Sequence, residues 1–234
     1  AIETSGTSCS AALSVDGEVR QRLEVAPRRH GELILAMMDA LLAEAGLKPQ
    51  ALDAMAFGRG PGSFTGLRIA AAVVQGAAFG AAVPVVPVST LAALAQGCHR
   101  RSGAERVLCA LDARMDEVYW GAYQLNGQGL MVLSGEEVVC APGKVAIAVD
   151  APDCWRASGP GWAAYPEALL SAVGERLCDA ASDPQEEFSA EAEARDLVVL
   201  AADGLLRGAV VSPDQALPIY LRNRVTAVPP RPAG

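Results

Sequence analysis

The chain opens with an alternation of apolar and polar residues that is typical of a β-hairpin. The segment "AIETSGTSCSAALSVDGEVRQRLEVA" indicates a short strand, a polar turn and a second strand from Cys9 to Val15. The dipeptide Asp16-Gly17, a preferred hairpin turn, then leads into a third strand. An acidic residue, Glu3, lies where the first strand meets its turn.

Helix and strand patterns alternate after this hairpin. Apolar periodicity predicts one helix that begins at His30 and ends at Gly46, and a second helix over 65–80. The short apolar runs "LDAMAFG" and "VPVVPVS" indicate buried strands after each helix.

The second half of the chain repeats this plan. "VLCALDARMDEVYWGAYQLNGQGLMVL" indicates a strand with Asp112 at its end, a polar turn, a strand from Val118 to Leu125, an Asn-Gly turn and another strand. We expect "KVAIAVD" to be a strand, "AAYPEALLSAVGERL" a helix, and "SAEAEARDLVVLAADGLLRG" a helix with Ser189 as its cap.

This internal duplication predicts an α/β protein of two ribonuclease H-like lobes. The polar stretch "GCHRRSGAER", near residues 97–105, reads as the joint between them. We therefore expect an N-terminal lobe over 1–99, a C-terminal lobe over 100–225, and a disordered tail over 226–234, which has too little apolar surface to bury.

The stretch "GRGPGSFTGLRIA" lies between a strand and a helix, which is the context of a phosphate-binding loop. Its spacing matches neither the Walker A nor the dinucleotide pattern, and its serine is not in a G-x-S-x-G elbow. We therefore expect a rigid turn, in which glycines permit a tight path and a hydroxyl caps the next helix. The residues assigned to this loop and cap are Gly58, Gly60, Pro61, Gly62, Ser63, Thr65 and Gly66.

Both N-terminal helices are apolar over more than one face. In the helix over 65–80, apolar residues gather on two nearly opposite sides: one can cover the sheet, and the other, lined by small residues, would let another helix approach closely. The two helices could simply pack on each other and on the sheet. Their wide apolar arcs instead favour an interface with another chain. The predicted interface residues are His30, Leu33, Met37, Leu41, Ile69, Ala72, Val73, Gly76 and Gly80.

Composition narrows the possible partners. A net charge of −8 argues against direct binding of nucleic acid, which requires a clustered Lys/Arg surface, although solubility alone could account for the acidity. No stretch reaches the roughly 18 apolar residues of a membrane span. The first residues lack a signal-peptide pattern, and the six cysteines show no CxxC spacing, so we expect a cytoplasmic protein in a reducing compartment.

Candidates for chemistry are few. The two histidines fit neither an HxxxH nor an HExxH motif, so no metal site is expected. Two strand-end acids, Glu3 and Asp112, could position a magnesium nucleotide between the lobes. Strand-end acids are also ordinary turn residues.

Five segments, in this order and spacing, resemble the TsaB (YeaZ) family of bacterial tRNA-modification proteins: "AIETSGTSCSAAL", "GRGPGSFTGLRIA", "PVSTLAALA", "ALDARMDEVYWGAY" and "PIYLRN". The resemblance covers nearly the whole chain, and "GPGSFTGLR" and "DARMDEVY" are its most distinctive parts. It implies two lobes of the actin-like and Hsp70-like ATPase (ASKHA) type.

The resemblance also implies a function. The family is similar to TsaD, the catalytic subunit that places a threonylcarbamoyl group on N6 of the adenosine next to the anticodon in tRNAs that read ANN codons. A TsaB protein is expected to be a non-catalytic partner that forms a heterodimer with TsaD, with the ATPase TsaE joining the assembly. A homodimer through the same surface is expected when TsaD is absent, and tRNA is expected only through the complex.

The chain departs from the family where catalysis would need it. The first-strand acid is usually Asp, and the longer Glu3 would misplace a nucleotide-bound magnesium, so Glu3, Thr4, Ser5 and Asp112 are expected to form at most a vestigial nucleotide site. No catalytic residue and no intrinsic cofactor is expected; ATP or ADP and magnesium or another metal are expected on the partner subunits. Two alternatives stay open: a stand-alone ASKHA ATPase or glycoprotease-like peptidase, and a homodimeric regulatory module outside any tRNA pathway.

Overall fold

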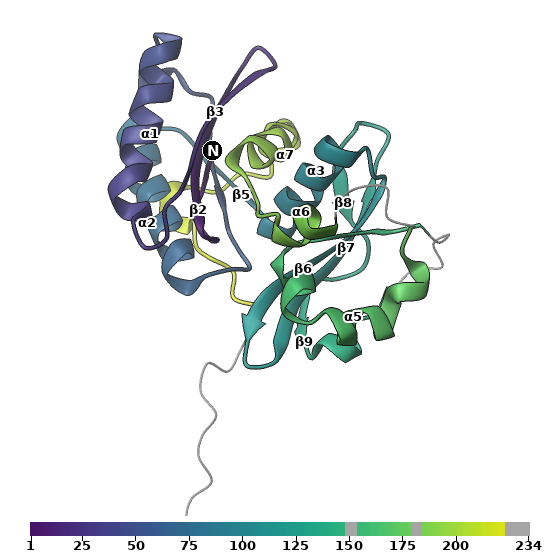
Figure 1. Ribbon diagram of the computed structural model, residues 1–234. Helices are drawn as coiled ribbons and strands as arrows, with labels where there is room; N and C mark the ends of the chain where they lie inside the picture. The colour runs from purple at the N-terminus through teal and green to yellow at the C-terminus, as the bar shows by residue number, and fades with distance from the viewer. Residues whose placement is uncertain (148–153, 179–183, 223–234) are drawn as a thin grey trace, which may run out of the picture.

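The computed structural model describes residues 1–147, 154–178 and 184–222, and its elements stack in five layers (Figure 1). Two helices cover the outer face of a first sheet, two more helices separate this sheet from a second one, and short helices cover the far face of the second sheet. The architecture is mixed α/β with two sheets, as the sequence pattern predicted.

The first sheet has the strand order β3-β2-β1-β4-β5. Its first three strands form the predicted antiparallel meander, while β4 and β5 run parallel to β1. Asp16 and Gly17 both have positive φ, of 51° and 86°, which is the backbone that a tight hairpin turn requires. The strands are β1 (Ile2–Glu3), β2 (Ser8–Val15), β3 (Glu18–Val25), β4 (Met55–Gly58) and β5 (Val85–Val88).

Helices α1 (His30–Ala45) and α2 (Phe64–Ala81) cover the outer face of this sheet, as expected. Gly46 closes α1 in the left-handed conformation, with φ of 66°. Length and composition alone would let α2 cross a membrane, but one of its faces, including Val74, is buried against the sheet. Burial of one face against a sheet is the packing of a helix that covers a sheet.

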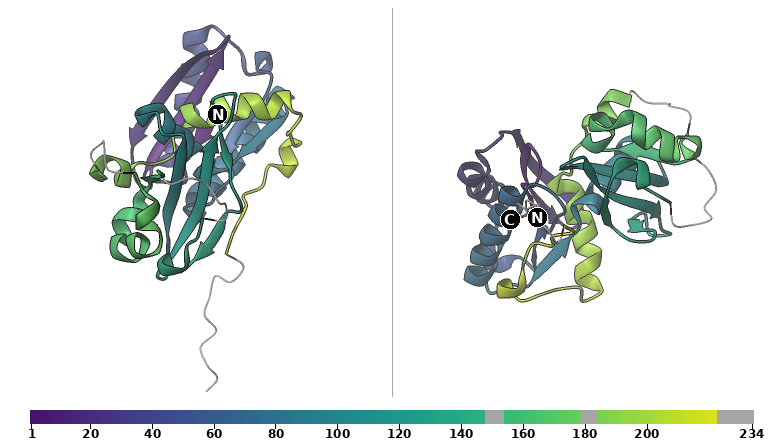
Figure 2. Two further views of the ribbon diagram at one scale, coloured as in Figure 1. Left: turned by 90° about the vertical axis from the view of Figure 1, so that its right-hand side faces the viewer. Right: turned by 90° about the horizontal axis from the view of Figure 1, so that it is seen from below.

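Helices α3 (Thr90–Ser102) and α7 (Ala194–Leu206) lie between the two sheets. The view from below shows α7 lying along the first lobe (Figure 2), and it contacts strands β2, β4 and β5 there. The predicted joint at 97–105 is therefore wrong over residues 97–102, which form the last turns of α3. The predicted boundary between residues 99 and 100 cuts this helix, and residues 194–206 of the predicted C-terminal lobe pack on the N-terminal sheet.

The polar residues that suggested a linker belong to an ion-paired helix surface. The Arg100 guanidinium in α3 donates to both carboxylate oxygens of Asp196 in α7, at 2.7 and 2.9 Å, and the Asp196 side chain is 3% exposed. Gly97 and Cys98 on the same helix are buried. Because Asp196 is remote in sequence, "CHRRS" alone could not be distinguished from a solvated loop.

The second sheet has the order β10-β6-β7-β8, with β9 also paired to β7. One face packs on α3, and the other forms a core with three fully buried tryptophans, Trp120, Trp155 and Trp162. The strands are β6 (Arg106–Arg114), β7 (Glu117–Leu125), β8 (Met131–Leu133), β9 (Val138–Cys140) and β10 (Arg156–Ser158), and the covering helices are α4 (Pro160–Ala164), α5 (Pro166–Val173) and α6 (Pro184–Ser189).

Several predicted elements of the second half are corrected by the structure. "KVAIAVD" is not a strand over residues 144–147, and residues 148–150 lie outside the described part; the strand nearby is β9. Ser189 ends α6 instead of capping α7, whose N-cap is Glu193. The predicted helix over 163–177 is divided among α4, α5 and a short 3₁₀ turn. This 3₁₀ turn covers Gly174–Arg176, and other single 3₁₀ turns cover Pro49–Ala51, Pro142–Lys144 and Pro213–Gln215.

Two cysteines form a disulfide, Cys154 with Cys178. This bond was not expected from the sequence, where the absence of CxxC spacing had favoured reduced cysteines. The cytoplasmic location stays a prediction, and so does the disordered tail, because residues 226–234 lie outside the described residues. The free cysteines are Cys9, Cys98, Cys109 and Cys140.

Candidate functional site

The glycine loop between β4 and α2 lies directly on the turn between β1 and β2. A Cβ atom added to Gly58 would lie 1.9 Å from Oε2 of Glu3, and one added to Gly66 would lie 2.0 Å from the carbonyl oxygen of Thr4. The Thr4 hydroxyl also donates to the Gly66 carbonyl at 2.8 Å. Glycine is therefore required at these positions, because the loop approaches the turn between β1 and β2 closely.

The rest of the loop has the predicted structural role. The Ser63 backbone N–H donates to the Ser5 carbonyl at 2.9 Å, and the Ser63 hydroxyl accepts from the Gly66 N–H, so Ser63 is the helix cap. Thr65, the alternative cap, is the second residue of α2 and is exposed. Gly60 adopts a positive φ of 106° before a cis bond to Pro61.

The carboxylate of Glu3 is buried beneath this loop, with 1% of the residue exposed. It accepts from the Ser5 backbone N–H at 2.6 Å and from the Thr90 hydroxyl at 3.3 Å. Desolvation by burial raises the pKa of Glu3 above its ordinary value, although these hydrogen bonds oppose the shift. The side chain is thus committed to internal contacts.

A second carboxylate approaches the same turn from the opposite end of the sequence. Glu191 accepts from the backbone N–H and the hydroxyl of Thr7 at 2.8 and 2.9 Å, and from the backbone N–H of Ser8 at 2.8 Å. Sequence reasoning did not identify Glu191. No local signal could have done so, because its partners lie 183 and 184 residues away.

The four residues of the possible nucleotide site are only partly brought together. Glu3, Thr4 and Ser5 lie under the glycine loop, whereas Asp112 is in β6 of the second sheet. The carboxylate of Asp112 accepts from the Arg114 backbone N–H at 2.7 Å and forms an ion pair with the Arg114 guanidinium at 3.0 Å. Its contacts within the described residues are with its own hairpin and with Tyr165, not with Glu3.

A buried polar cluster joins the lobes beside the glycine loop, and sequence reasoning missed it. The Glu137 carboxylate accepts from the hydroxyls of Tyr123, at 2.6 Å, and Ser89. The Arg59 guanidinium lies 3.9 Å from the same carboxylate. Burial, and then the nearby charge of Glu137, raise the pKa of the Tyr123 phenol well above its ordinary value.

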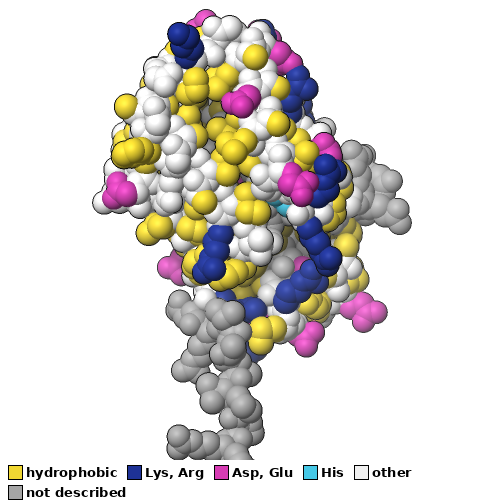
Figure 3. All heavy atoms as spheres, turned by 90° about the vertical axis from the view of Figure 1, so that its left-hand side faces the viewer, with side chains coloured by type: hydrophobic (Ala, Val, Ile, Leu, Met, Phe, Trp, Pro, Cys, Tyr) yellow, Lys and Arg dark blue, Asp and Glu magenta, His cyan; other side chains and the backbone are white. Residues whose placement is uncertain are grey.

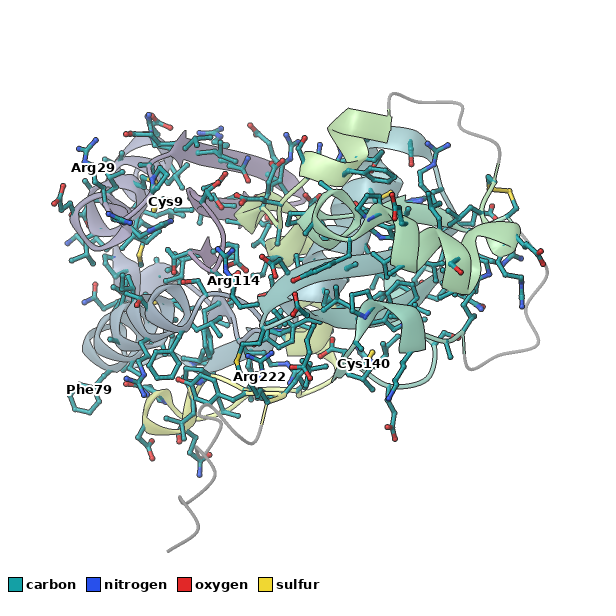
Figure 4. The ribbon with its side chains drawn as sticks, turned by 60° about the horizontal axis from the view of Figure 1, so that its bottom comes forward. Cys9, Arg29, Phe79, Arg114, Cys140 and Arg222 are labelled. Atoms are coloured by element: carbon teal, nitrogen blue, oxygen red, sulfur yellow. A yellow bond between two sulfur atoms is a disulfide. The ribbon has the colours of Figure 1, made fainter. Side chains whose placement is uncertain are left out.

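The last described segment, residues 218–222, connects the glycine loop to the second lobe. The Ile219 backbone N–H donates to the Arg59 carbonyl at 2.8 Å. Three residues later, the Arg222 guanidinium donates to the Arg114 carbonyl at 3.2 Å and forms an ion pair with Glu117 (Figure 4). In this structure Arg222 is therefore a bridge between parts of the chain.

The predicted interface on α1 and α2 divides into buried and accessible residues. His30, Met37 and Leu41 are buried, at 6%, 9% and 3% exposure, so their assignment to an interface is corrected: their side chains fill the lobe's own interior. They lie on the side of α1 that faces the sheet, which the width of the apolar arc could not separate from the outer side. Leu33, Ile69 and Val73 are half-buried and pack against the same core.

The small residues predicted on α2 are accessible. Ala72, Gly76 and Gly80 are exposed, and a Cβ atom at either glycine would meet no atom within 4 Å. A shallow groove of about 290 Å³ runs between α1 and α2 beside these glycines, with Met38 and Leu42 among its lining residues. Hydrophobic side chains are spread over this face of the molecule (Figure 3).

A large aromatic side chain is exposed near the C-terminal end of α2. Phe79 is 81% exposed and projects away from α2 into solvent (Figure 4). On α1, Leu35 lines the groove and is 52% exposed. A groove lined by small residues and flanked by large exposed apolar side chains has features of a protein-binding surface.

The two histidines have different surroundings. The His30 side chain is buried, with Nε2 unpartnered among the described residues, and Nδ1 of His99 lies 2.9 Å from the Ala104 carbonyl oxygen. In the described part of the chain, no group of three or more His, Cys, Asp or Glu side chains is arranged to hold a metal ion. Metal and nucleotide on partner subunits stay predictions.

Comparisons with known proteins agree on one family. The family model of TsaD, tRNA N6-adenosine threonylcarbamoyltransferase, matches residues 24–228. The chain is 39% identical to the "tRNA threonylcarbamoyladenosine biosynthesis protein TsaB" of Escherichia coli K12, over 96% of this chain and 94% of that protein. The protein of the same name from Haemophilus influenzae is also 39% identical, over 97% of this chain and 94% of its own length.

Solved structures show the same relationship. A structure described as YeaZ from Pseudomonas aeruginosa is 47% identical, with a TM-score of 0.81, and covers 94% of this chain and 97% of its own. A second, described as an uncharacterized protein with similarity to the peptidase YeaZ, has a TM-score of 0.82 at the same identity and coverage. At 47% identity the similarity includes the sequence as well as the fold.

Proposed function

The chain belongs to the TsaB (YeaZ) family, and on that premise we propose that it is a non-catalytic subunit in tRNA threonylcarbamoyladenosine biosynthesis that forms a heterodimer with TsaD. Its role in this proposal is to make TsaD competent to transfer a threonylcarbamoyl group to N6 of the adenosine next to the anticodon. The names of the curated relatives, over nearly the whole chain, support the pathway.

The open glycine face of α2 carries the proposal of a protein partner. Two packed helices approach to about 8–10 Å between axes, and the shortest distances need small side chains at the contact. Gly76 and Gly80 are one turn apart on α2, and both face open space. The groove beside them has one charged lining residue, Asp39. An apolar helix that binds there would therefore remove few charged groups from water, which costs little free energy.

The state of the residues under the glycine loop supports a subunit without its own ATPase activity. Glu3 accepts two internal hydrogen bonds beneath Gly58 and is not directed at an open cleft. A peptidase would need a nucleophile with an adjacent base. Among the described residues, neither histidine forms a side-chain hydrogen bond to a serine or cysteine side chain.

Gly76→Arg is the sharpest test, because the new side chain enters open space and leaves the lobe intact. We expect binding to purified TsaD, measured by calorimetry, to weaken at least about 100-fold, as blocking a central contact does. Threonylcarbamoyl transfer to tRNA by TsaD should fall in parallel. The isolated variant should keep the secondary structure of the unmodified chain, measured by circular dichroism.

Gly127→Arg is the matched control, since a Cβ atom at this glycine of the second lobe would also meet no atom within 4 Å. It should bind TsaD like the unmodified chain. Equal binding by both variants would contradict the interface, while transfer activity that does not depend on the chain at all would contradict the subunit role. ATP hydrolysis or peptide cleavage by the isolated chain would instead favour the alternative of an independent enzyme.

The other partners follow from the same proposal. A homodimer through the α1–α2 surface, when TsaD is absent, should also be broken by Gly76→Arg in size-exclusion chromatography with light scattering. With a net charge of −8, the chain is suited to meet tRNA only through its complex. TsaE, together with ATP or ADP and a metal, is proposed to contribute from the partner side, in the cytoplasm.

A further inference from the structure

The two cysteines of the disulfide lie on neighbouring segments that the backbone also holds together. The Trp155 backbone N–H donates to the Arg176 carbonyl at 2.9 Å, and the Cys178 N–H donates to the Trp155 carbonyl at 2.9 Å. The Cys154 N–H donates to the same Arg176 carbonyl at 3.1 Å. The Trp155 side chain is fully buried in the core of the second lobe. Because none of these contacts involves sulfur, we expect both segments to stay adjacent when the disulfide is reduced.

The disulfide is accessible to a thiol in solution. Cys154 is exposed and Cys178 is half-buried. Cys154 also has a positive φ of 86°, a backbone conformation that costs free energy in a residue other than glycine. Exposed or strained disulfides are the ones that thiol–disulfide exchange opens most readily, since the attacking thiolate must reach a sulfur atom. In this respect the bond differs from a buried structural disulfide.

The free cysteines are poor competitors in this exchange. Cys9, Cys98 and Cys109 are buried. Burial raises the pKa of the Cys9 thiol to about 11 and that of Cys98 to about 12, and it raises the pKa of Cys109 well above its ordinary value. Cys140 is half-buried, and burial raises its pKa as well. Because the thiolate is the reactive form, these four thiols stay protonated and largely unreactive at neutral pH.

We propose that Cys154 and Cys178 are a reversible dithiol–disulfide site of the folded chain, with a dithiol as its reductant. A thiolate of the dithiol attacks the Cys154 sulfur, the S–S bond breaks, and the Cys178 sulfur leaves with the electron pair and takes a proton. The second thiol of the reductant then displaces the Cys154 sulfur, which takes another proton, so the dithiol is oxidised and both cysteines are reduced. Glutathione disulfide reverses the reaction by accepting the two electrons.

The state of this site alters the stability of the second lobe. The bond closes the loop over residues 154–178, which contains β10, α4 and α5 at the edge and on the far face of the second sheet. A disulfide stabilises mainly by restricting the unfolded chain, so reduction destabilises this loop while its native hydrogen bonds remain. The proposed partner surface on α2 belongs to the first lobe. This inference is therefore independent of the proposed function.

Alkylation of the native full chain tests this inference. In dithiothreitol without denaturant, Cys154 and Cys178 should become reactive towards iodoacetamide, measured by peptide mass spectrometry, while the other cysteines stay largely unmodified. Reduction should lower Tm by roughly 5–10 °C, as expected for a closed loop of this length. Replacement of the dithiol by glutathione disulfide should restore both the bond and the Tm. Hydrogen exchange should increase around Trp155 and Leu177 but not in α2.

Cys154→Ser and Cys140→Ser are the matched variants. Cys154→Ser should lose the response of Tm to dithiothreitol, whereas Cys140→Ser should keep it. The measurements on the unmodified chain decide the question even if Cys154→Ser does not fold. A bond that opens only in denaturant, a bond that does not form again with glutathione disulfide, or a reduction that leaves Tm unchanged would overturn the proposal.

Discussion

Each lobe begins its sheet with a strand, a turn and a second strand, yet the two turns are held in different ways. The first turn, between β1 and β2, is closed by distant parts of the chain: Gly66 presses on Thr4, and Glu191 binds Thr7. The second turn, between β6 and β7, is more exposed, although remote Arg222 contacts the Arg114 carbonyl and the Met115 sulfur. Its Arg114 side chain is 85% exposed, and Met115 is 59% exposed.

The backbone shows the same contrast. Arg114, Met115 and Asp116 all have left-handed φ values, of 61°, 57° and 56°, and the Asp112 carboxylate accepts the Arg114 N–H from within the hairpin. A turn supported by its own hairpin tolerates exposed and strained residues. In the first turn Gly6 and Thr7 are exposed, but Thr4 and Ser5 are buried under remote segments, so the cost of a substitution against them is set by those segments.

The largest expected effect is at the close contact under the first turn. Gly66→Ala places a Cβ atom 2.0 Å from the Thr4 carbonyl oxygen, a backbone atom that cannot move aside. We expect a loss of more than about 3 kcal/mol in the free energy of unfolding, measured by denaturant titration.

Gly127→Ala gives the matched comparison in the second lobe, where a Cβ atom meets nothing within 4 Å. Its free energy of unfolding should change by no more than about 0.5 kcal/mol. Similar losses in both variants would show that the first turn is no tighter than the second lobe.

The next effect is a pH dependence that originates under the first turn. Because burial raises the folded-state pKa of Glu3 above the ordinary value of 4.5, the folded chain holds this proton more tightly than the unfolded chain. The contribution of Glu3 to stability is therefore full below pH 4.5 and is lost as the pH rises through the raised pKa.

Glu3→Gln removes this titration. The stability of the unmodified chain should fall relative to Glu3→Gln as the pH is raised from about 4.5 to 8, by about 1.4 kcal/mol for each pH unit that separates the folded-state and unfolded-state pKa values. Denaturant midpoints across this range measure the difference. A difference between the two proteins that stays constant with pH would contradict the raised pKa.

The smallest effect is expected at the second turn. Met115→Gly replaces a left-handed non-glycine residue whose side chain is largely exposed. Glycine adopts the left-handed conformation without strain, but it loses more conformational entropy on folding. The first effect is slightly larger, so the free energy of unfolding should rise by about 0.5 kcal/mol. Thermal unfolding would measure it, and a clear loss of stability would mean that the contact at 3.3 Å between the Arg222 guanidinium and the Met115 sulfur stabilises this turn.

The sequence predicted elements where local pattern decides them. Asp16-Gly17 marked the first hairpin, Gly46 marked the end of α1, and Ser63 was one of two expected caps of α2. It failed where a polar surface depends on a remote partner. Residues 97–102 were predicted to be a linker because they are polar. They form a helix held by the ion pair of Arg100 with Asp196, and no nearby residue in the sequence indicates that pair.

The candidate site divides in the same way. Glycine spacing alone excluded the common phosphate loops, and small residues on α2 indicated a face open to a partner. Which apolar residues of α1 face outward was not predictable, because a wide apolar arc does not say where the sheet lies. Only burial separated Met37 and Leu41 from that surface.

By itself, the sequence determined the α/β class, the duplicated hairpins, the family and the need for glycines before α2, since these rest on residues close together in the chain. The tertiary structure decided that those glycines press on Thr4, that α7 lies between the sheets, and that Glu191 fills the first turn. Those outcomes depend on contacts between residues 62 to 184 positions apart, which only the packed fold brings within hydrogen-bonding distance.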